Sequence, residues 1–297
     1  MTSKTIHREA FAKINVFLRV LSSRDDGYHD LESLVLPISW SDAVTVRPDE
    51  RLRVEVRGAP AMSGETPAGG MNLALVAALG LADVCSKAGG ALIEIEKRIP
   101  LAAGLGGGSA DAAATIHALN ELWGCRHDPA TLTQVAERVG SDVPAMLLGG
   151  PVLMSGRGEF LAPAEVATFW WVVVQHGFGV RSPDAYRWWD EAGAEPGPDP
   201  EPALDAAAAG DAKGLGAAMF NDLEAAVTKR HPQIQTTKDE LLQRGALGAV
   251  MTGSGSSVVG LASDRAHAEE LAAAVPNAVV ASGPPPPRDN LELSGVV

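Results

Sequence analysis

The residues best suited to chemistry are the glycines within residues 100–114, which read Pro-Leu-Ala-Ala-Gly-Leu-Gly-Gly-Gly-Ser-Ala-Asp-Ala-Ala-Ala. Four of the five positions 104–108 are glycine, and a helix-forming run follows directly. Glycine lets the backbone approach a ligand closely. A glycine loop that enters a helix also presents unpaired backbone N–H groups, and the helix dipole adds partial positive charge there. The pattern therefore predicts a site for phosphate groups.

Two well-known phosphate loops do not match this stretch. The Walker loop requires a lysine before its serine, whereas Ser109 follows Gly108 directly. The dinucleotide fingerprint requires glycine three residues after Gly106, where Ser109 stands. A flexible linker is the alternative, but a linker does not normally run straight into a long helix. In the predicted loop Ser109 is an N-cap or a phosphate donor, and Asp111 is expected in the first helical turn.

Three polar residues elsewhere could act on a bound substrate. Lys13 and Asn15 lie two positions apart in residues 10–20, whose alternation predicts a half-buried strand with both side chains on one face. Asp142 stands in Gly-Ser-Asp-Val-Pro after a predicted helix at 129–139, at an exposed turn or in the first turn of a new helix. From the residues alone, the strand face could be a solvated edge and the aspartate a helix cap.

Aromatic residues form a further group of candidates. The turn signal Asp26-Gly27 places Tyr28 and His29 side by side. Tyr186 lies in a helix that is predicted to open at Ser182. Packing is the alternative for both tyrosines, at the rim of a hairpin for Tyr28 and in an aromatic core stripe for Tyr186.

Two segments could support the predicted loop. Asn72 opens a helix expected to run to about residue 87, where the residues alone indicate an ordinary N-cap. Residues 249–260 form a strand, a second glycine turn and a strand. A tight hairpin is the alternative for that turn.

The elements that must position these residues mix strands and helices without a regular βαβ rhythm, which predicts an α+β fold. Further strands are expected at residues 34–39, 43–47, 52–57, 91–97, 152–155, 159–161, 169–175 and 278–281. Further helices are expected at residues 203–209, 212–229 with a possible break near 220–221, 232–243 and 265–274. Residues 58–70 and 194–202 are expected to be loops rich in proline or glycine.

Composition excludes several classes of protein. The 297 residues carry a formal net charge of −13, which argues against nucleic acid or an anionic membrane as a partner. No run of 18 apolar residues predicts a membrane span, and no signal peptide is recognisable. The two cysteines, Cys85 and Cys125, cannot form a disulfide framework and belong to no CxxC pair. A reducing cytoplasm is the predicted location.

The stretch Pro-x-x-x-Gly-Leu-Gly-Gly-Gly-Ser-Ala-Asp-Ala resembles the ATP loop of the GHMP kinases, and the resemblance extends from about Lys13 to about Leu261. Ala-Lys-Ile-Asn, Gly-Ser-Asp-Val-Pro and the second glycine turn are similar to further motifs of that family. The resemblance implies a two-lobed α+β fold with the site in the cleft between the lobes. It implies an N-terminal ATP-binding domain of the ribosomal protein S5 domain 2 type at 1–161 and a ferredoxin-like domain at 162–283. The run of prolines after Gly283 predicts a mobile tail at 284–297.

The resemblance also implies roles for individual residues. Asp142 would be the catalytic base, and Lys13 would stabilise its anion and the phosphoryl charge. ATP is the implied co-substrate, with Mg²⁺ as its expected counter-ion, although the seven histidines show no metal-ligand spacing. The implied ATP contacts are Asn72, Pro100, Leu101, Ala102, Ala103, Gly104, Leu105, Gly106, Gly107, Gly108, Ser109 and Ala110.

Asp-Gly-Tyr-His-x-Leu is similar to the motif of the family branch that phosphorylates a cytidine diphosphate-linked polyol, which is the implied small-molecule partner. Tyr28 and Tyr186 would stack on the cytosine and His29 would bond its polar edge, while Asn15 and Ser182 complete the candidate substrate contacts. Two alternatives remain: a GHMP kinase for a homoserine-type or mevalonate-type alcohol, and a nucleotide-binding sensor without catalysis. The Tyr-His pair speaks against the first, and the presence of both Lys13 and Asp142 against the second.

Overall fold

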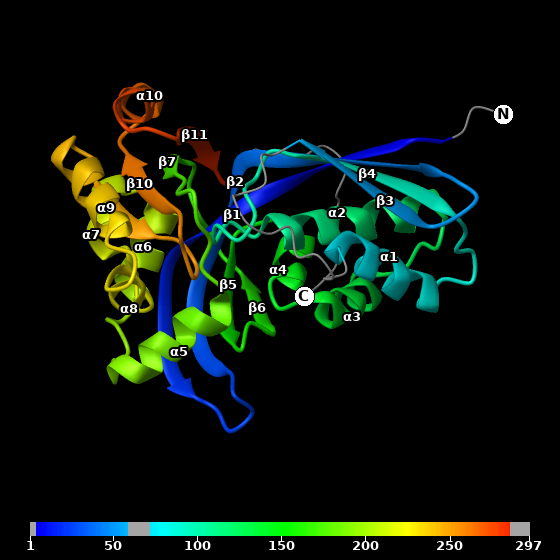
Figure 1. Ribbon diagram of the computed structural model, residues 1–297, viewed down its shortest axis with the longest axis horizontal. Helices are drawn as coiled ribbons and strands as arrows, with labels where there is room; N and C mark the ends of the chain where they lie inside the picture. Colours follow the sequence, from blue (N-terminus) through cyan, green and yellow to red (C-terminus); the bar gives the residue numbers. More distant parts are fainter. Residues whose placement is uncertain (1–3, 59–71, 286–297) are drawn as a thin grey trace.

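The computed structural model describes residues 4–58 and 72–285. Within these residues the chain forms a seven-stranded sheet and a four-stranded sheet, joined by one long antiparallel hairpin that runs through the middle of the molecule (Figure 1). The α+β prediction is confirmed. The predicted loop at 58–70 lies outside the described residues except for Gly58, and so does the predicted tail at 284–297 except for its first two residues.

The seven-stranded sheet is organised around β1 (Ile6–Ser23) and β2 (His29–Pro48), which pair along almost their whole length. Its order is β3-β4-β2-β1-β8, with β5 on β2 and β6 on β5. The other strands of this sheet are β3 (Arg53–Gly58), β4 (Ala91–Lys97), β5 (Val152–Gly156), β6 (Phe160–Pro163) and β8 (Phe220–Asn221).

The strand β2 is continuous, whereas the sequence predicted separate strands at 34–39 and 43–47. Pro37 lies inside the first of these predicted strands and has no N–H to donate. The structure accommodates it opposite Lys13, where the register between β1 and β2 shifts. A bulge is one of the places in a sheet where proline is tolerated. A second register shift follows between Asn15 and Phe17, so the part of β1 that carries Lys13 and Asn15 is irregular on both sides.

Four helices cover one face of this sheet: α1 (Leu73–Val84), α2 (Gly107–Leu122), α3 (Pro129–Val139) and α4 (Val143–Leu148). Their apolar residues and those of the sheet share one core. The alanines of α2 are small enough to let this helix be buried along most of its length. The loop that precedes α2 is therefore attached to a rigid element.

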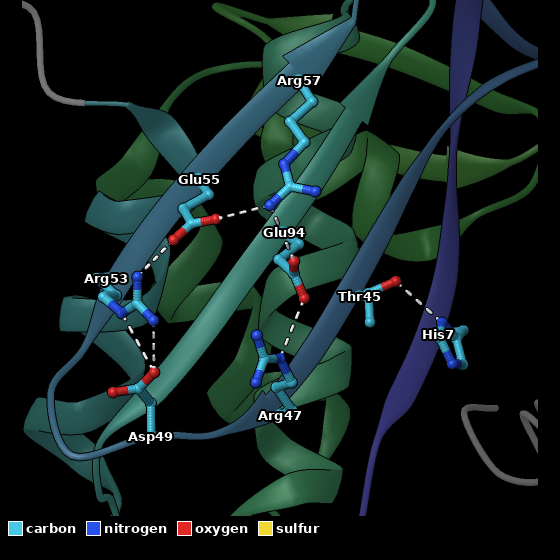
Figure 2. A network of polar contacts seen from close by, with 8 residues as sticks. All are labelled: His7, Thr45, Arg47, Asp49, Arg53, Glu55, Arg57 and Glu94. Carbon is cyan, nitrogen blue, oxygen red and sulfur yellow. Dashed lines mark hydrogen bonds and ion pairs between the residues drawn. The ribbon is translucent and has the colours of Figure 1, made fainter.

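The opposite face of the same sheet is polar around β3 and β4. Figure 2 shows alternating charges across β2, β3 and β4, where Arg53 contacts Asp49 and Glu55, and Arg47 contacts Glu94. Such exposed ion pairs contribute little to stability, with typical values of about 0–1 kcal/mol each. They mark this part of the face as solvated, whereas apolar residues of β1 and β2 outside it are buried against the second sheet.

The four-stranded sheet has the antiparallel order β11-β7-β10-β9, which is the 4-1-3-2 order of a ferredoxin-like unit. Its strands are β7 (Phe169–Val174), β9 (Gly248–Met251), β10 (Val258–Ala262) and β11 (Ala278–Gly283). The helices of this part are α5 (Ser182–Ala192), α6 (Glu201–Ala209), α7 (Ala212–Ala218), α8 (Glu224–Thr228), α9 (Gln233–Gln243) and α10 (Arg265–Ala274).

The two sheets are not separated cleanly along the chain. The predicted boundary between residues 161 and 162 falls inside β6. The predicted helix at 212–229 is interrupted, as the sequence suggested, near residues 220–221. The strand β8 lies there and pairs in parallel with Phe17 and Leu18 of β1. One apolar core joins both sheets through residues such as Phe17 and Trp171. The lobes thus share β1, the strand that carries Lys13.

The cysteines correct the sequence analysis, which predicted no disulfide. Cys85 and Cys125 form one, although 40 positions separate them. Cys85 is the C-cap of α1, and Cys125 follows the end of α2. The two helices run side by side, so their ends bring the cysteines together. Of the helices in the described ranges, none has the length and apolar character needed to cross a membrane.

Candidate active site

The glycine loop leaves β4 at Lys97 and enters α2 at Gly107. Gly104 and Gly106 have φ values of 78° and 66°, in the left-handed region that favours glycine. Added Cβ atoms would also collide with neighbours, at 2.1 Å from the carbonyl oxygen of Thr252 for Gly104 and at 2.9 Å from Cγ of Lys13 for Gly106. These two glycines are therefore required both by the turn and by close packing.

The start of α2 differs from the prediction in two details. Its N-cap is Gly106, and Ser109 is the third helical residue, which leaves the role of phosphate donor for this serine. Asp111 lies beyond the first turn and is buried. Gly107 is the first helical residue, and side-chain atoms of Ile99 and Lys97 occupy the space where its Cβ would lie. The backbone N–H groups of the first turn have no partner four residues earlier in the helix, which is the arrangement that suits an anion.

The rest of the loop divides into buried and accessible positions. The side chains of Ala103, Leu105 and Ala110 are buried, so these residues can meet a ligand only through their backbone. Ala102 has a φ of 52°, an unusual value for a residue other than glycine. Gly108 lies next to Leu73, the first residue of α1.

The second glycine turn packs against the first loop. The N–H of Ser257 donates to the carbonyl oxygen of Ala103 at 3.2 Å, and Thr252 lies against Gly104. Asn221 of β8 holds this turn by donating to the carbonyl oxygens of Met251 and Gly253 at 2.7 and 2.8 Å. The turn is more than a hairpin, because it supports the glycine loop from the other sheet.

Lys13 is buried at the junction of these parts. Its N–H donates to the carbonyl oxygen of Leu105 at 3.0 Å. Its Nζ donates to Oδ1 of Asn15 at 2.5 Å, which confirms that the two side chains share a face. Burial lowers the pKa of Lys13, and the carboxylate of Asp142 opposes that shift. Asn15 in turn donates through Nδ2 to Ser33 at 2.7 Å.

Asp142 lies before α4 in a short turn that follows Gly140, the C-cap of α3. Its carboxylate makes no capping hydrogen bond to α4, so Asp142 does not act as a side-chain cap of this helix. Oδ2 lies 3.9 Å from Nζ of Lys13, and 41% of the side chain is exposed. The carboxylate is therefore held beside a cation and remains accessible to a substrate.

A row of aromatic groups continues from Asp142. Burial, and then the charge of Asp142, raise the pKa of Tyr186. The ring of Tyr186 stacks on His29 with a centroid distance of 4.8 Å, and Trp189 meets the same imidazole edge-on. Nε2 of His29 lies 2.9 Å from Oδ1 of Asp190. His29 and Tyr186, distant in sequence, thus belong to one cluster, whereas Trp189 is part of the core.

Three further predicted residues lie in separate places. Tyr28 is 53% exposed at the tip of the β1–β2 hairpin, with the guanidinium of Arg157 over its ring at 4.7 Å. The hydroxyl of Ser182 donates to the hydroxyl of Ser254 in the second glycine turn at 3.2 Å. Asn72 caps α1, its Oδ1 accepting from the N–H of Ala74 at 2.8 Å.

Several residues that complete the site carried no signal in the sequence. Ser33, Asn221 and Asp190 each hold a predicted residue or loop in place, but none of them belongs to a motif that marks such a role in the sequence. Thr252 lies in the predicted second glycine turn, but its hydrogen bond to the N–H of Asn15 had no signal in the sequence. Arg157 stands in Gly-Arg-Gly, a turn signal that pointed to a loop and not to a contact with Tyr28. Their partners are set by contacts between distant segments.

Comparison with known proteins supports a family assignment. The model of the GHMP kinase N-terminal domain matches residues 72–150, and that of the GHMP kinase C-terminal domain matches residues 203–281. A 4-diphosphocytidyl-2-C-methyl-D-erythritol kinase of Deinococcus radiodurans is 41% identical over 271 residues, covering 91% of this chain and 88% of the relative. One of Symbiobacterium thermophilum is 41% identical over 260 residues, covering 86% and 90%.

Solved structures agree. A crystal structure of 4-(cytidine 5'-diphospho)-2C-methyl-D-erythritol kinase matches with a TM-score of 0.80 and 34% identity, covering 94% of this chain and 99% of the other. A homoserine kinase from Cytophaga hutchinsonii matches with a TM-score of 0.71 and 20% identity, covering 95% and 94%, and shows the same fold. The chain belongs to the GHMP kinase family and has the two-lobed fold and the ATP-dependent small-molecule kinase character of that family.

Proposed function

We propose that this protein transfers the γ-phosphoryl group of ATP to the 2-hydroxyl of 4-diphosphocytidyl-2-C-methyl-D-erythritol, a step of non-mevalonate isoprenoid precursor synthesis. The observation that carries the proposal is the position of Lys13. Its backbone bonds the glycine loop at Leu105, its side-chain carbons pack on Gly106, and its Nζ lies beside Asp142. One residue thus connects a candidate phosphate site with a candidate base.

Phosphoryl transfer needs mainly positioning and stabilisation of charge. In the proposed mechanism the backbone N–H groups from Gly104 to Ser109 bind the phosphates of ATP. Asp142 accepts the proton of the attacking hydroxyl, for which an accessible carboxylate is suited. Lys13, held by Asn15, places its ammonium group beside the aspartate and stabilises the charge on the transferred group.

Mg²⁺ enters the proposal as the counter-ion of ATP, where it neutralises phosphate charge. Between residues 104 and 110, Ser109 has the one side-chain oxygen. Mg²⁺ typically takes only one or two protein ligands beside phosphates and water, so this small donor set fits. Ser109 is the residue that would hold it.

The proposed substrate site is the cluster of His29 and Tyr186 together with Tyr28 at the hairpin tip. The imidazole of His29 is fixed by Asp190, which leaves its other ring nitrogen for the edge of a base. The relatives at 41% identity are named for a cytidine diphosphate-linked polyol.

A cytoplasmic location, where ATP is available, is part of the proposal. A reducing compartment tends to open disulfides such as Cys85–Cys125.

The test is an assay of ADP release with a panel of alcohols. The panel contains the cytidine diphosphate-linked methylerythritol, its analogue without cytidine, homoserine and mevalonate. We expect turnover of the first compound with a kcat/KM at least about 5-fold above the others, since loss of base stacking alone removes about 1–3 kcal/mol, or about 5- to 150-fold. Preference for homoserine or mevalonate would contradict the proposed substrate, and no turnover of any compound would favour a sensor.

A further inference from the structure

A buried cluster of three charged residues lies beside the glycine loop and takes no part in the proposed chemistry. Asp42 of β2, Lys97 at the end of β4 and Asp111 of α2 are 0%, 6% and 4% exposed. Lys97 donates through Nζ to Oδ2 of Asp42 and, at 2.8 Å, to Oδ2 of Asp111. One lysine therefore connects the sheet to the helix that follows the loop.

The same cluster also holds the beginning of the loop. Oδ1 of Asp42 accepts hydrogen bonds from the N–H groups of Arg98 and Ile99, at 2.5 and 2.8 Å. These are the first residues after β4, whereas Asp111 lies just beyond the other end of the loop. The ion pairs through Lys97 thus join both ends of the glycine loop to one point of the sheet.

The loop is built to accept this cluster. A Cβ at Gly107 would lie 3.3 Å from Nζ of Lys97 and 2.9 Å from Cγ2 of Ile99, so glycine at 107 leaves room for the lysine beneath the first helical turn. Buried groups that can carry charge are an inefficient means of stabilising a fold, because desolvation offsets their attraction. These groups instead fix the position of the backbone, since their directional hydrogen bonds determine where the first turn of α2 begins.

We propose that Asp42, Lys97 and Asp111 are positioning residues, forming a clamp that holds the backbone N–H groups of the glycine loop in the arrangement that binds the nucleotide phosphates. The clamp rests on the proposed role of the loop as the ATP site. It acts through the loop and does not touch the substrate. Binding of ATP should therefore depend on it more than the chemical step does, because its hydrogen bonds hold the two ends of the loop and not Asp142.

Asp111 is the position at which to test the clamp. Replacing Lys97 would leave two unpaired carboxylates in the core, and such a variant can fail to fold. Asp111→Ala removes one arm and leaves the Asp42–Lys97 pair intact. Asp111→Asn keeps an oxygen acceptor for Lys97 and loses only the charge. Asp128→Ala is the matched control, because Asp128 caps α3 in the same part of the molecule and makes no contact with the loop.

The measurements are steady-state kinetics at pH 8 and hydrogen exchange of the loop amides, at a temperature well below the melting point of each variant. We expect Asp111→Ala to raise KM for ATP about 10-fold, while kcat and KM for the alcohol stay within about 3-fold. Exchange of amides 101–109 should become faster. Asp111→Asn should have a KM for ATP and a rate of loop amide exchange close to those of the wild type. Asp128→Ala should change neither the KM nor the exchange rate.

Hydrogen exchange of the unchanged protein with and without ADP separates the two proposals. Protection of amides 101–109 by ADP supports the loop as the nucleotide site. If ADP protects these amides but Asp111→Ala lowers only the melting temperature, with KM for ATP and loop exchange unchanged, the clamp is overturned and the ion pairs serve the fold. If ADP does not protect them, the assignment of the loop is wrong, and the clamp falls with it.

Discussion

Nζ of Lys13 lies 3.9 Å from Oδ2 of Asp142, and only the lysine of this pair is buried. At that separation, and with one partner exposed, the pair adds little to stability. The pair instead places a positive charge beside an accessible carboxylate. The lysine comes from β1, the strand shared by both lobes, and the aspartate from a turn between two helices. A substrate hydroxyl can reach the carboxylate from solvent while the cation stays fixed against the glycine loop.

Asp142→Asn is predicted to lower kcat by about 10²–10⁴-fold, the usual scale for loss of a general base. The affinity for ADP, measured by calorimetry, should stay within about 3-fold, because the amide retains the shape of the side chain. Asp128→Asn is the matched control, since asparagine caps α3 as well as aspartate does. A variant that keeps more than a third of wild-type kcat would remove Asp142 from the mechanism.

Tyr28→Ala is predicted to raise KM for the cytidine substrate by about 5- to 150-fold, which corresponds to stacking of about 1–3 kcal/mol. Because Tyr28 is 53% exposed, its loss should barely change the melting temperature, and KM for ATP should not move. Phe160→Ala truncates a ring that is 65% exposed and serves as the control. Equal KM values for the cytidine substrate in both variants would contradict a cytosine contact at Tyr28.

The stability of the protein should depend on pH through Asp111. Burial raises the pKa of Asp111 to about 7; Lys97 opposes this shift and Asp42 adds to it. Between about pH 4 and 7 the folded state therefore holds a proton that the unfolded state releases, so this group makes the free energy of unfolding fall as pH rises. The slope contributed by one proton is at most about 1.4 kcal/mol per pH unit.

Asp111→Asn removes this titration. Urea unfolding at half-unit steps from pH 4.5 to 8 should show a flatter profile for the variant than for the wild type. Asp128→Asn should keep the wild-type slope, since that carboxylate is exposed. Parallel profiles for wild type and Asp111→Asn would mean that Asp111 stays ionised across the whole range.

Reduction of the Cys85–Cys125 disulfide is predicted to lower the free energy of unfolding by up to about 4 kcal/mol. The estimate follows from the entropy of an unfolded chain freed from a loop of 40 residues. Guanidinium unfolding with and without a phosphine reductant measures it. The double variant Cys85→Ser/Cys125→Ser should not respond to reductant, and an identical midpoint for the wild type under both conditions would show that the bond adds nothing to stability.

Much of the site could be predicted from the sequence, because its signals are local. The run of glycines before an alanine-rich helix specifies a turn followed by free N–H groups, whatever surrounds it. The spacing of Lys13 and Asn15 specifies a shared face, and their hydrogen bond at 2.5 Å confirms it. Even the break near residue 220 was visible in the pattern, although its identity as a strand was not.

Tertiary structure alone decided what each of these residues touches. His29 meets Asp190 across 161 positions, Asn15 meets Thr252 across 237, and Lys97 meets Asp42 across 55. The same holds for Cys85 and Cys125, which the ends of two neighbouring helices bring together. Local patterns encode backbone conformation and the choice between core and solvent, whereas a partner at long range is selected by how whole elements pack. That is why the sequence predicted the loop and the two catalytic candidates, and why only the fold revealed the buried ion pairs beneath them.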